Sequence, residues 1–330
     1  MKKNPSLAMV VLIALAAFSC SKLPPKAGSA TGESMLGLLP ADSNGFFLLD
    51  VHRAVTTTAA EKALEDEETR KKYDEFVRET GIDPMKDVFY LAAGMKLHPE
   101  MKSVEAALVI NLKYDREAVL AKLREEAKGI DESDYEGLVI YAIPVPVEEQ
   151  REKPYFAFLD PSNIAFGSKA GVMAVIDIVR KKADSVLKSA EMSPVLKSAD
   201  TEALAWGAFA LSGELVDKMI EDNAMLAPFK GVTGLLMAFD YKSGSMLIDF
   251  RTRGGTPENN KNLADSLNGL KAMGALAAGQ EPLVGELLGR IDITSGADFV
   301  RVHADIPQEV MDKLQQAAKS KLGGLIPPEK

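Results

Sequence analysis

Histidine is scarce in this sequence, and the best acid–base candidate is the histidine that follows an aspartate by two positions. The three histidines are His52, His98 and His303. His52 follows Asp50 by two residues, so on a β-strand the two side chains would share a face and could form an acid–base pair. A polar strand end explains the same spacing, and we favour that interpretation. His303 would share a strand face with Arg301, which predicts a mixed, solvent-facing surface.

Metal-ligand patterns are also missing from the sequence. A zinc site needs three or four nitrogen, sulfur or oxygen ligands, but the chain has no His-Glu-x-x-His motif and no pair of cysteines. The acidic stretch Asp131-Glu132-Ser133-Asp134 lacks the central glycine and the terminal glutamate of an EF-hand loop. The sequence therefore predicts neither a metal nor a cofactor.

Two short motifs have the spacing of catalytic or phosphate-binding segments. Ser185-Val186-Leu187-Lys188 has the Ser-x-x-Lys spacing of penicillin-binding enzymes, but their companion motifs are absent, which indicates a solvated helix end. Gly167-Ser168-Lys169-Ala170-Gly171 lies between a predicted strand and a predicted helix, where backbone N–H groups could hold an anion. Without the full phosphate-loop pattern, we interpret it as a tight turn with Ser168 near the N-cap.

The charged and aromatic residues indicate structural roles, on an exposed helix and in the core, and not a catalytic or binding site. Acidic and basic residues are mixed from Glu61 to Glu79, and pairs such as Glu68–Lys72 at i,i+4 are typical of an exposed helix. Trp206 is the only tryptophan and lies in the apolar stretch 204–211, which predicts a core position. The aromatic content of 6% argues against a carbohydrate-binding cleft.

Cys20 is the only cysteine, and the residues before it form a pattern of their own. Lys2 and Lys3 precede an apolar run over 7–18, and the small residue Ser19 comes immediately before Cys20. An apolar run of this length is too short to cross about 30 Å of hydrocarbon, so the order indicates a secretory signal peptide over 1–19. A lone thiol at the cleavage point predicts chemical modification.

The residues Ala17-Phe18-Ser19-Cys20 resemble the lipobox of bacterial type II signal peptides. Ser19 and Cys20 fit that pattern well, whereas Ala17 and Phe18 depart from it. The resemblance implies a diacylglyceryl group on Cys20, and two or three acyl chains make a stable membrane anchor without a spanning helix. It also implies that Ser21, in place of aspartate, favours the outer membrane over the inner membrane. The alternative is an ordinary signal peptide with an incidental cysteine.

The charge of the mature chain limits its partners. Loss of Lys2 and Lys3 takes the formal net charge from −9 to −11. An acidic body argues against nucleic acid and against an electrostatic hold on anionic lipid. Segment 20–35 is rich in Pro, Gly and polar residues, which predicts a flexible tether between Cys20 and a folded body that begins near Leu36.

Hydrophobic periodicity predicts an α+β fold with antiparallel sheets and helices packed on one face. In the first half we expect strands over 45–51, 88–95, 104–114, 138–143, 155–159 and 164–167. The helices are expected within 58–80, 116–128 and 171–183. The last two strands are joined by Asp160-Pro161-Ser162-Asn163, whose residues are typical of a hairpin turn.

The second half repeats the same order of elements. Strands are expected over 204–211, 235–241, 245–251, 286–294 and 298–304. Helices are expected over 214–220, after Thr256-Pro257, and over 307–322. Thr256 as N-cap with Pro257 in the first turn is a favoured helix start.

Both halves therefore give the order strand, helix, two strands, helix, strands, helix, which predicts an internal pseudo-repeat. We expect a first half over 36–183, a connector over 184–202, a second half over 203–322 and a tail over 323–330. The alternative is that the two halves are not a true repeat, because any α+β chain can be divided into a similar order of strands and helices.

Leu39-Pro40-Ala41-Asp42 before the first strand, and Gly81-Ile82-Asp83-Pro84 before the second, resemble the opening of uncharacterised exported bacterial proteins from a family described only as a domain of unknown function. The resemblance covers about 40–183. It implies a fold and carries no catalytic residues.

The sequence as a whole favours a membrane-anchored lipoprotein of the cell envelope that binds a protein partner or an apolar ligand. Two other hypotheses stay open at this point. One is a hydrolase or transferase without a recognisable motif, using Asp50, His52 or dispersed carboxylates. The other is an architectural envelope protein that associates with itself.

Overall fold

The computed structural model describes residues 28, 30–97, 104–126, 129–144 and 153–323. The chain divides into two compact units, Met1–Ala210 and Leu211–Lys330, which we call unit 1 and unit 2. Cys20, His98, the predicted signal peptide over 1–19 and nearly all of the expected tail over 323–330 lie outside the described residues. None of the described helices is long and apolar enough to cross a membrane.

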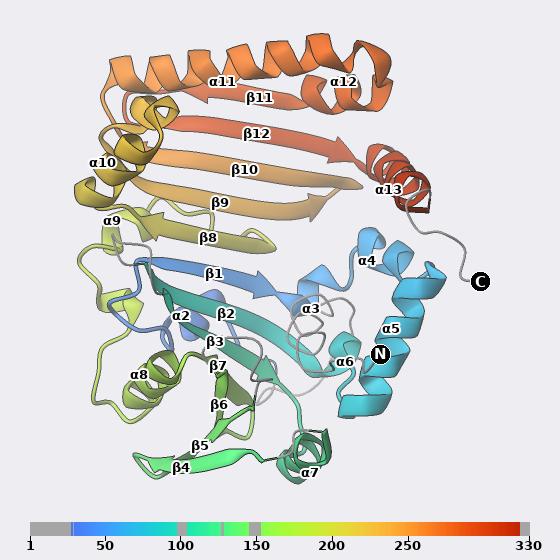
Figure 1. Cartoon of the computed structure of the whole chain (residues 1–330), viewed down its shortest axis with the longest axis vertical. Coiled ribbons are helices and arrows are strands. Elements are labelled where there is room, and N and C mark those ends of the chain that lie inside the picture. Colours follow the sequence, from blue (N-terminus) through green and yellow to red (C-terminus); the bar gives the residue numbers. More distant parts are fainter. Residues whose placement is uncertain (1–27, 29, 98–103, 127–128, 145–152, 324–330) are drawn as a thin grey trace. The chain divides into compact units, whose positions relative to one another are not determined.

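Unit 1 is built on an antiparallel sheet with the strand order β8-β1-β2-β3-β7-β6-β5-β4 (Figure 1). Its strands are β1 (Gly45–Asp50), β2 (Val88–Leu97), β3 (Val104–Leu112), β4 (Asp131–Tyr135), β5 (Leu138–Ala142), β6 (Tyr155–Asp160), β7 (Asn163–Gly167) and β8 (Ala205–Ala210). Its helices are α2 (Gly32–Leu36), α3 (Val51–Ala54), α4 (Thr58–Ala63), α5 (Glu67–Thr80), α6 (Pro84–Asp87), α7 (Arg116–Glu126), α8 (Lys169–Val179), η1 (Val186–Lys188) and α9 (Ser193–Leu196).

Unit 2 has a four-stranded antiparallel sheet with the order β11-β12-β10-β9. Its strands are β9 (Val232–Lys242), β10 (Ser245–Gly254), β11 (Ile291–Ser295) and β12 (Val300–Pro307). Its helices are α10 (Gly213–Asp222), η2 (Ala224–Phe229), α11 (Pro257–Ala277), η3 (Ala278–Gln280), α12 (Pro282–Gly289) and α13 (Gln308–Gly323). The prediction of an α+β fold with antiparallel sheets is confirmed.

The same connection order recurs in the two units, as the pseudo-repeat predicts. In unit 1 the hairpin β2–β3 is followed by α7 and by the hairpin β6–β7, whose last strand pairs with β3. In unit 2 the hairpin β9–β10 is followed by α11 and α12 and by the hairpin β11–β12, whose last strand pairs with β10. A helix follows each repeat, α8 in the first and α13 in the second. The hairpin β4–β5 is an addition in unit 1.

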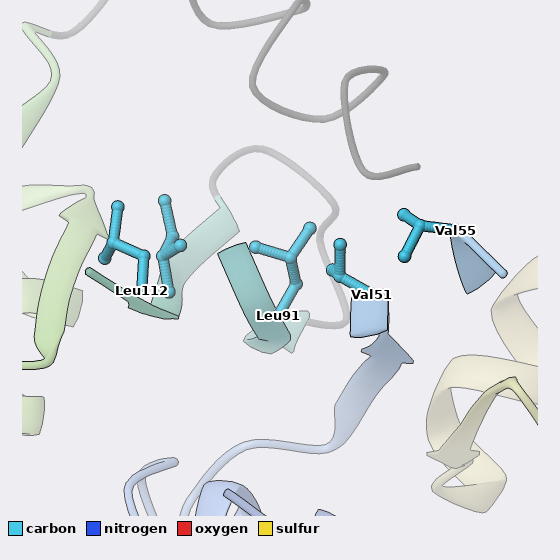
Figure 2. Close-up of a cluster of buried hydrophobic side chains, with 5 residues drawn as sticks. Val51, Val55, Leu91 and Leu112 are labelled. Atoms are coloured by element: carbon cyan, nitrogen blue, oxygen red, sulfur yellow. The ribbon is translucent and has the colours of Figure 1, made fainter. Parts of the chain in front are cut away.

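The core of unit 1 has side chains on both faces of its sheet. Figure 2 shows Val51 and Val55 in a row with Leu91 and Leu112, in a cluster that also contains Ile110. Strand neighbours point to opposite faces, so the buried residues Ala92 and Val109 lie on the other face. Helix α8 contacts β3, β6 and β7, and its Val172, Val175 and Ile176 are buried.

The boundary between the units differs from the expected one. We expected β8 to open the second half at 203, but β8 pairs with β1 and places Trp206 in the core of unit 1. The expected connector over 184–202 contains η1 and α9, and its Val186, Met192 and Val195 are buried. Apolar residues within a polar segment therefore fold the connector into unit 1, and the boundary falls after Ala210.

Two segments expected to be simpler are more structured. The tether was expected to run to residue 35, but Thr31 and Ser34 form a capping box that starts α2, and Met35 is buried. The long helix expected within 58–80 is two helices, because the side chain of Asp66 accepts a hydrogen bond from the Thr69 N–H and caps α5.

Candidate functional site

Asp50 and His52 lie at the junction between a strand and a helix. Strand β1 ends at Asp50 and helix α3 begins at Val51, so the two residues do not share a strand face. The Asp50 carboxylate accepts a hydrogen bond from the Arg53 N–H at 2.9 Å and acts as the N-cap of α3. The His52 ring lies 6.2 Å from the Phe89 ring, measured between centroids. Both residues therefore have a structural role at the strand-to-helix junction.

His303 lies in a charged cluster on the sheet of unit 2. Arg301 and His303 project from β12 on the same face, and the opposing residue on β10 is Asp249. Asp249 Oδ2 accepts a hydrogen bond from Arg301 Nε at 2.6 Å and lies 3.2 Å from His303 Nδ1. The hydrogen bond to Asp249 raises the pKa of Arg301. The cluster is a partly exposed ion-pair network, in keeping with the mixed polar surface that the sequence predicts.

The turn over 167–171 packs against the backbone of strand β3. Ser168 caps α8 by accepting a hydrogen bond from the Gly171 N–H at 3.1 Å, as its position in the sequence predicts. A Cβ on Gly171 would lie 2.3 Å from the carbonyl oxygen of Ala106 on β3. A Cβ on Gly167 would lie equally close to the same oxygen, so the two glycines allow α8 to approach β3 closely. This close packing explains why glycines occur at 167 and 171, and no bound phosphate is needed to explain them.

The remaining candidate motifs also have structural explanations. Lys188 Nζ lies 2.6 Å from Asp184 Oδ1 in an exposed ion pair, so the Ser185-x-x-Lys188 spacing is that of a solvated turn. Residues 131–134 form the first four positions of strand β4, which sequence reasoning missed because acidic residues are rare in strands. Lys72 pairs with Glu68 at 2.6 Å on α5, as predicted. No group of three or more possible metal ligands occurs among the residues that the structure describes.

Helix α11 has an unusual surface that sequence reasoning missed. Its Leu270, Met273 and Leu276 are 51%, 59% and 83% exposed, and we call these three residues the α11 apolar surface. Nearer the start of the same helix, Leu263 and Ala264 are buried in a cluster with Val300 of β12. The C-terminal half of α11 therefore presents large apolar side chains to solvent.

The spacing of these residues explains why their exposure rises along the helix. An α-helix turns about 100° per residue, so a step of three residues moves the side chain about 60° backward around the axis. Leu270 lies beside the buried face that Leu263 defines, and Met273 and Leu276 move progressively to the solvent side. The helix begins at the predicted Thr256 cap, which accepts a hydrogen bond from the Asn259 N–H at 3.1 Å.

Charge is absent from this part of the helix surface. From Ala272 to Gln280 the sequence has no charged residue. Lys271 is directed to the sheet, where its ammonium group donates a hydrogen bond to the carbonyl oxygen of Ile291 on β11. The following helix α12 packs against α11, with Leu288 beside Gly274, and adds the exposed Val284. The low charge over 272–280 is the sequence signal that could have identified this surface.

No family model matches the chain, and no curated protein matches it. Among solved structures, TP0453 in crystal form III matches with a TM-score of 0.49 and 10% identity, over 86% of this chain and 97% of that chain. Crystal form I of TP0453 gives a TM-score of 0.46 and 10% identity, covering 86% and 96% of the two chains. Crystal form IV gives 0.45 and 9%, covering 88% and 99%. With TM-scores below 0.5, we base no functional argument on this likeness.

Proposed function

We propose that this protein is a lipoprotein of the bacterial cell envelope, anchored to a membrane through lipid on Cys20, and that its body acts by binding and not by catalysis. The observation that carries the binding role is the α11 apolar surface. Exposed apolar side chains gathered on one element of a soluble body are typical of interaction sites. The signal peptide and the lipobox-like residues Ala17-Phe18-Ser19-Cys20 support the anchor.

The geometry of the candidate residues favours binding over catalysis. Asp50 caps a helix, His303 belongs to an ion-pair network, and Ser168 caps α8. An acid–base or nucleophilic mechanism needs such groups to converge within hydrogen-bond reach of one reacting atom. Each of these side chains instead has a local role that accounts for its position.

The anchor is tested by mass spectrometry of the mature N-terminus after expression in a bacterium with two membranes. We expect the chain to begin at Cys20 with a diacylglyceryl group and to fractionate with membranes. The Cys20→Ser variant should carry no diacylglyceryl group in the same measurement. An unmodified Cys20, or cleavage at another residue, would overturn the proposed anchor.

Outer-membrane placement is a separate part of the proposal and has its own test. Ser21 after the cysteine is the residue that supports it. In a host that sorts lipoproteins by this position, we expect the wild-type chain in the outer-membrane fraction and Ser21→Asp in the inner-membrane fraction. Ser21→Ala serves as the control and should behave as the wild type. Equal distribution of all three chains would contradict the outer-membrane proposal.

A further inference from the structure

We infer that the α11 apolar surface binds the phospholipid bilayer itself, with Leu270, Met273 and Leu276 inserted among the acyl chains at the membrane surface. The inference deepens the proposed function, because it names the partner of the surface on which that proposal rests. It depends on the anchor only for keeping the body close to a bilayer.

The chemistry of the surface favours hydrocarbon over a protein partner. Binding hot spots in protein interfaces are enriched in Trp, Tyr and Arg, while Leu and Val are under-represented. The α11 apolar surface contains none of the favoured residues, and its side chains offer no hydrogen bonds. Transfer of aliphatic side chains and a thioether from water to an apolar phase lowers the free energy without any need for a matching polar partner.

The backbone of this segment also fits a hydrocarbon environment. Lipid tails cannot hydrogen-bond to a peptide group, so a segment that enters them must satisfy its backbone internally. Helix α11 is continuous over Pro257–Ala277, and at its end the N–H of Ala278 is shared between the carbonyl oxygens of Gly274 and Leu276. Lys271 is held on the Ile291 carbonyl and so keeps its charge away from the inserted side.

Proximity to the membrane makes even a weak apolar contact effective. Thr31, the cap of α2, comes eleven positions after Cys20, and a fully extended chain of that length spans at most about 40 Å. A lipid on Cys20 would therefore confine the body near the bilayer and turn insertion of α11 into an intramolecular step. Three partly inserted side chains would then suffice without a spanning helix.

The charge of the protein separates this contact from an electrostatic one. The mature chain carries a formal charge of −11, so anionic headgroups would repel it. Binding through the α11 apolar surface should therefore not require anionic lipid and should persist in high salt, since salt screens charges and does not weaken apolar burial.

The test measures binding of the mature chain from residue 20, carrying Cys20→Ser, to vesicles of phosphatidylcholine by co-flotation. This chain has no acyl group, so any binding comes from the body. We expect measurable binding that is unchanged in high salt. The triple variant Leu270→Gln, Met273→Gln, Leu276→Gln should bind at least about tenfold more weakly, because it loses most of the apolar area that the bilayer would bury.

A matched control places glutamine at three polar positions of the same helix, Asn262→Gln, Ser266→Gln and Asn268→Gln, all of which are exposed. Leu187→Gln removes an exposed leucine from η1 in unit 1. Both controls should bind vesicles as the parent does. All variants should keep the parent's circular dichroism and melting temperature, since the altered side chains are exposed.

A local probe shows where the protein contacts lipid. Cys20→Ser removes the only cysteine, so Met273→Cys can carry a single polarity-sensitive dye. The emission of the dye should shift to shorter wavelength when vesicles are added, whereas the same dye at Asn262→Cys should not respond.

Four results would overturn the inference. They are equal binding of parent and triple variant, no binding of the parent, binding that needs anionic lipid and disappears in high salt, and a concentration-dependent dimer that only the triple variant lacks. The last would assign the surface to a second copy of the chain. Failure of the anchor leaves this experiment unaffected, because vesicle binding is measured without the acyl group.

Discussion

The hydroxyl of Tyr73 in α5 donates a 2.5 Å hydrogen bond to the carboxylate of Asp83, the residue that caps α6. Asp83 also accepts hydrogen bonds from the Met85 N–H at 2.9 Å and from Lys86 Nζ at 2.6 Å. Burial opposes ionisation of Asp83, but these hydrogen bonds outweigh it and hold its pKa below the ordinary value. Burial, followed by the bond to Asp83, raises the pKa of Tyr73. The contact therefore contributes to both pKa shifts and joins α5 to α6.

This pair predicts a loss of stability in acid. A carboxyl group with a lowered pKa in the folded state stabilises the protein above its unfolded pKa, and that contribution is lost as the pH falls through the folded value. Asp83→Asn should lower the stability of unit 1 by about 1 kcal/mol at neutral pH. The difference from wild type should shrink below about pH 4. Urea unfolding followed by the fluorescence of Trp206 measures it.

The same pair predicts a second loss in alkali. A tyrosine with a raised pKa in the folded state contributes stability below its unfolded pKa, and that contribution is lost as the pH rises through the folded value. Wild-type unit 1 should therefore lose stability above about pH 10, and Tyr73→Phe should lose less over the same range. Parallel decline of the two proteins would show that Tyr73 does not couple ionisation to folding.

Gly171 and Gly269 make a matched pair of helical glycines with opposite predictions. A methyl group on Gly171 would collide with the Ala106 carbonyl oxygen, whereas a methyl group on Gly269 would meet nothing within 4 Å. Gly171→Ala should destabilise unit 1 by about 2 kcal/mol or more, since α8 must move away from β3. Gly269→Ala should stabilise α11 by up to about 1 kcal/mol. Thermal melts compare the two, and equal effects would contradict the close approach.

The hairpin β9–β10 turns through Ser243 and Gly244, both of which have positive φ. Two-residue turns with this backbone favour Asn-Gly, because asparagine tolerates the left-handed region better than serine. Ser243→Asn should raise the stability of unit 2 by a few tenths of a kcal/mol, and Gly244→Ala should lower it by about 1 kcal/mol. Calorimetry of the two variants gives the sign of each effect.

Local sequence signals predict many of the elements because the forces that form them are local. The hairpin from β6 to β7 follows from the turn residues Asp160-Pro161-Ser162-Asn163, and α11 begins at the predicted Thr256 cap. Near-continuous apolar runs identify β2 and β3 because side chains on both faces of these strands are buried. These signals lie within about ten residues of the structure that they specify.

Features that depend on distant residues could not be predicted in this way. Strand β8 belongs to unit 1 because it pairs with β1, about 160 residues earlier in the chain, and no local pattern encodes that choice. Strand β4 is polar at four of its five positions, so only its pairing with β5 makes it a strand. The strand face expected to hold Asp50 and His52 together does not form because Asp50 caps a helix, and caps and strand ends use the same residue types.

The α11 apolar surface was missed for a different reason. Periodicity identifies the face of a helix that packs in a core, and Leu263 and Leu267 satisfy it. The later residues Leu270, Met273 and Leu276 follow at steps of three, and each step turns the side chain about 60° away from that face. Counting apolar residues at helical spacing does not register this rotation, and their exposure shows it.

The ion-pair network of Asp249 gives the last prediction. Arg301 and His303 both contact the same carboxylate oxygen, and Arg301 makes the charge-assisted hydrogen bond through Nε. Asp249→Asn removes the negative charge that faces Arg301 and His303. It should lower the stability of unit 2 by about 1 kcal/mol at low salt. The effect should decrease in high salt, since these groups are partly exposed. His303→Gln should cost less, because Arg301 still satisfies Asp249. A cost for His303→Gln as large as that for Asp249→Asn, measured by urea unfolding, would contradict the leading role of Arg301.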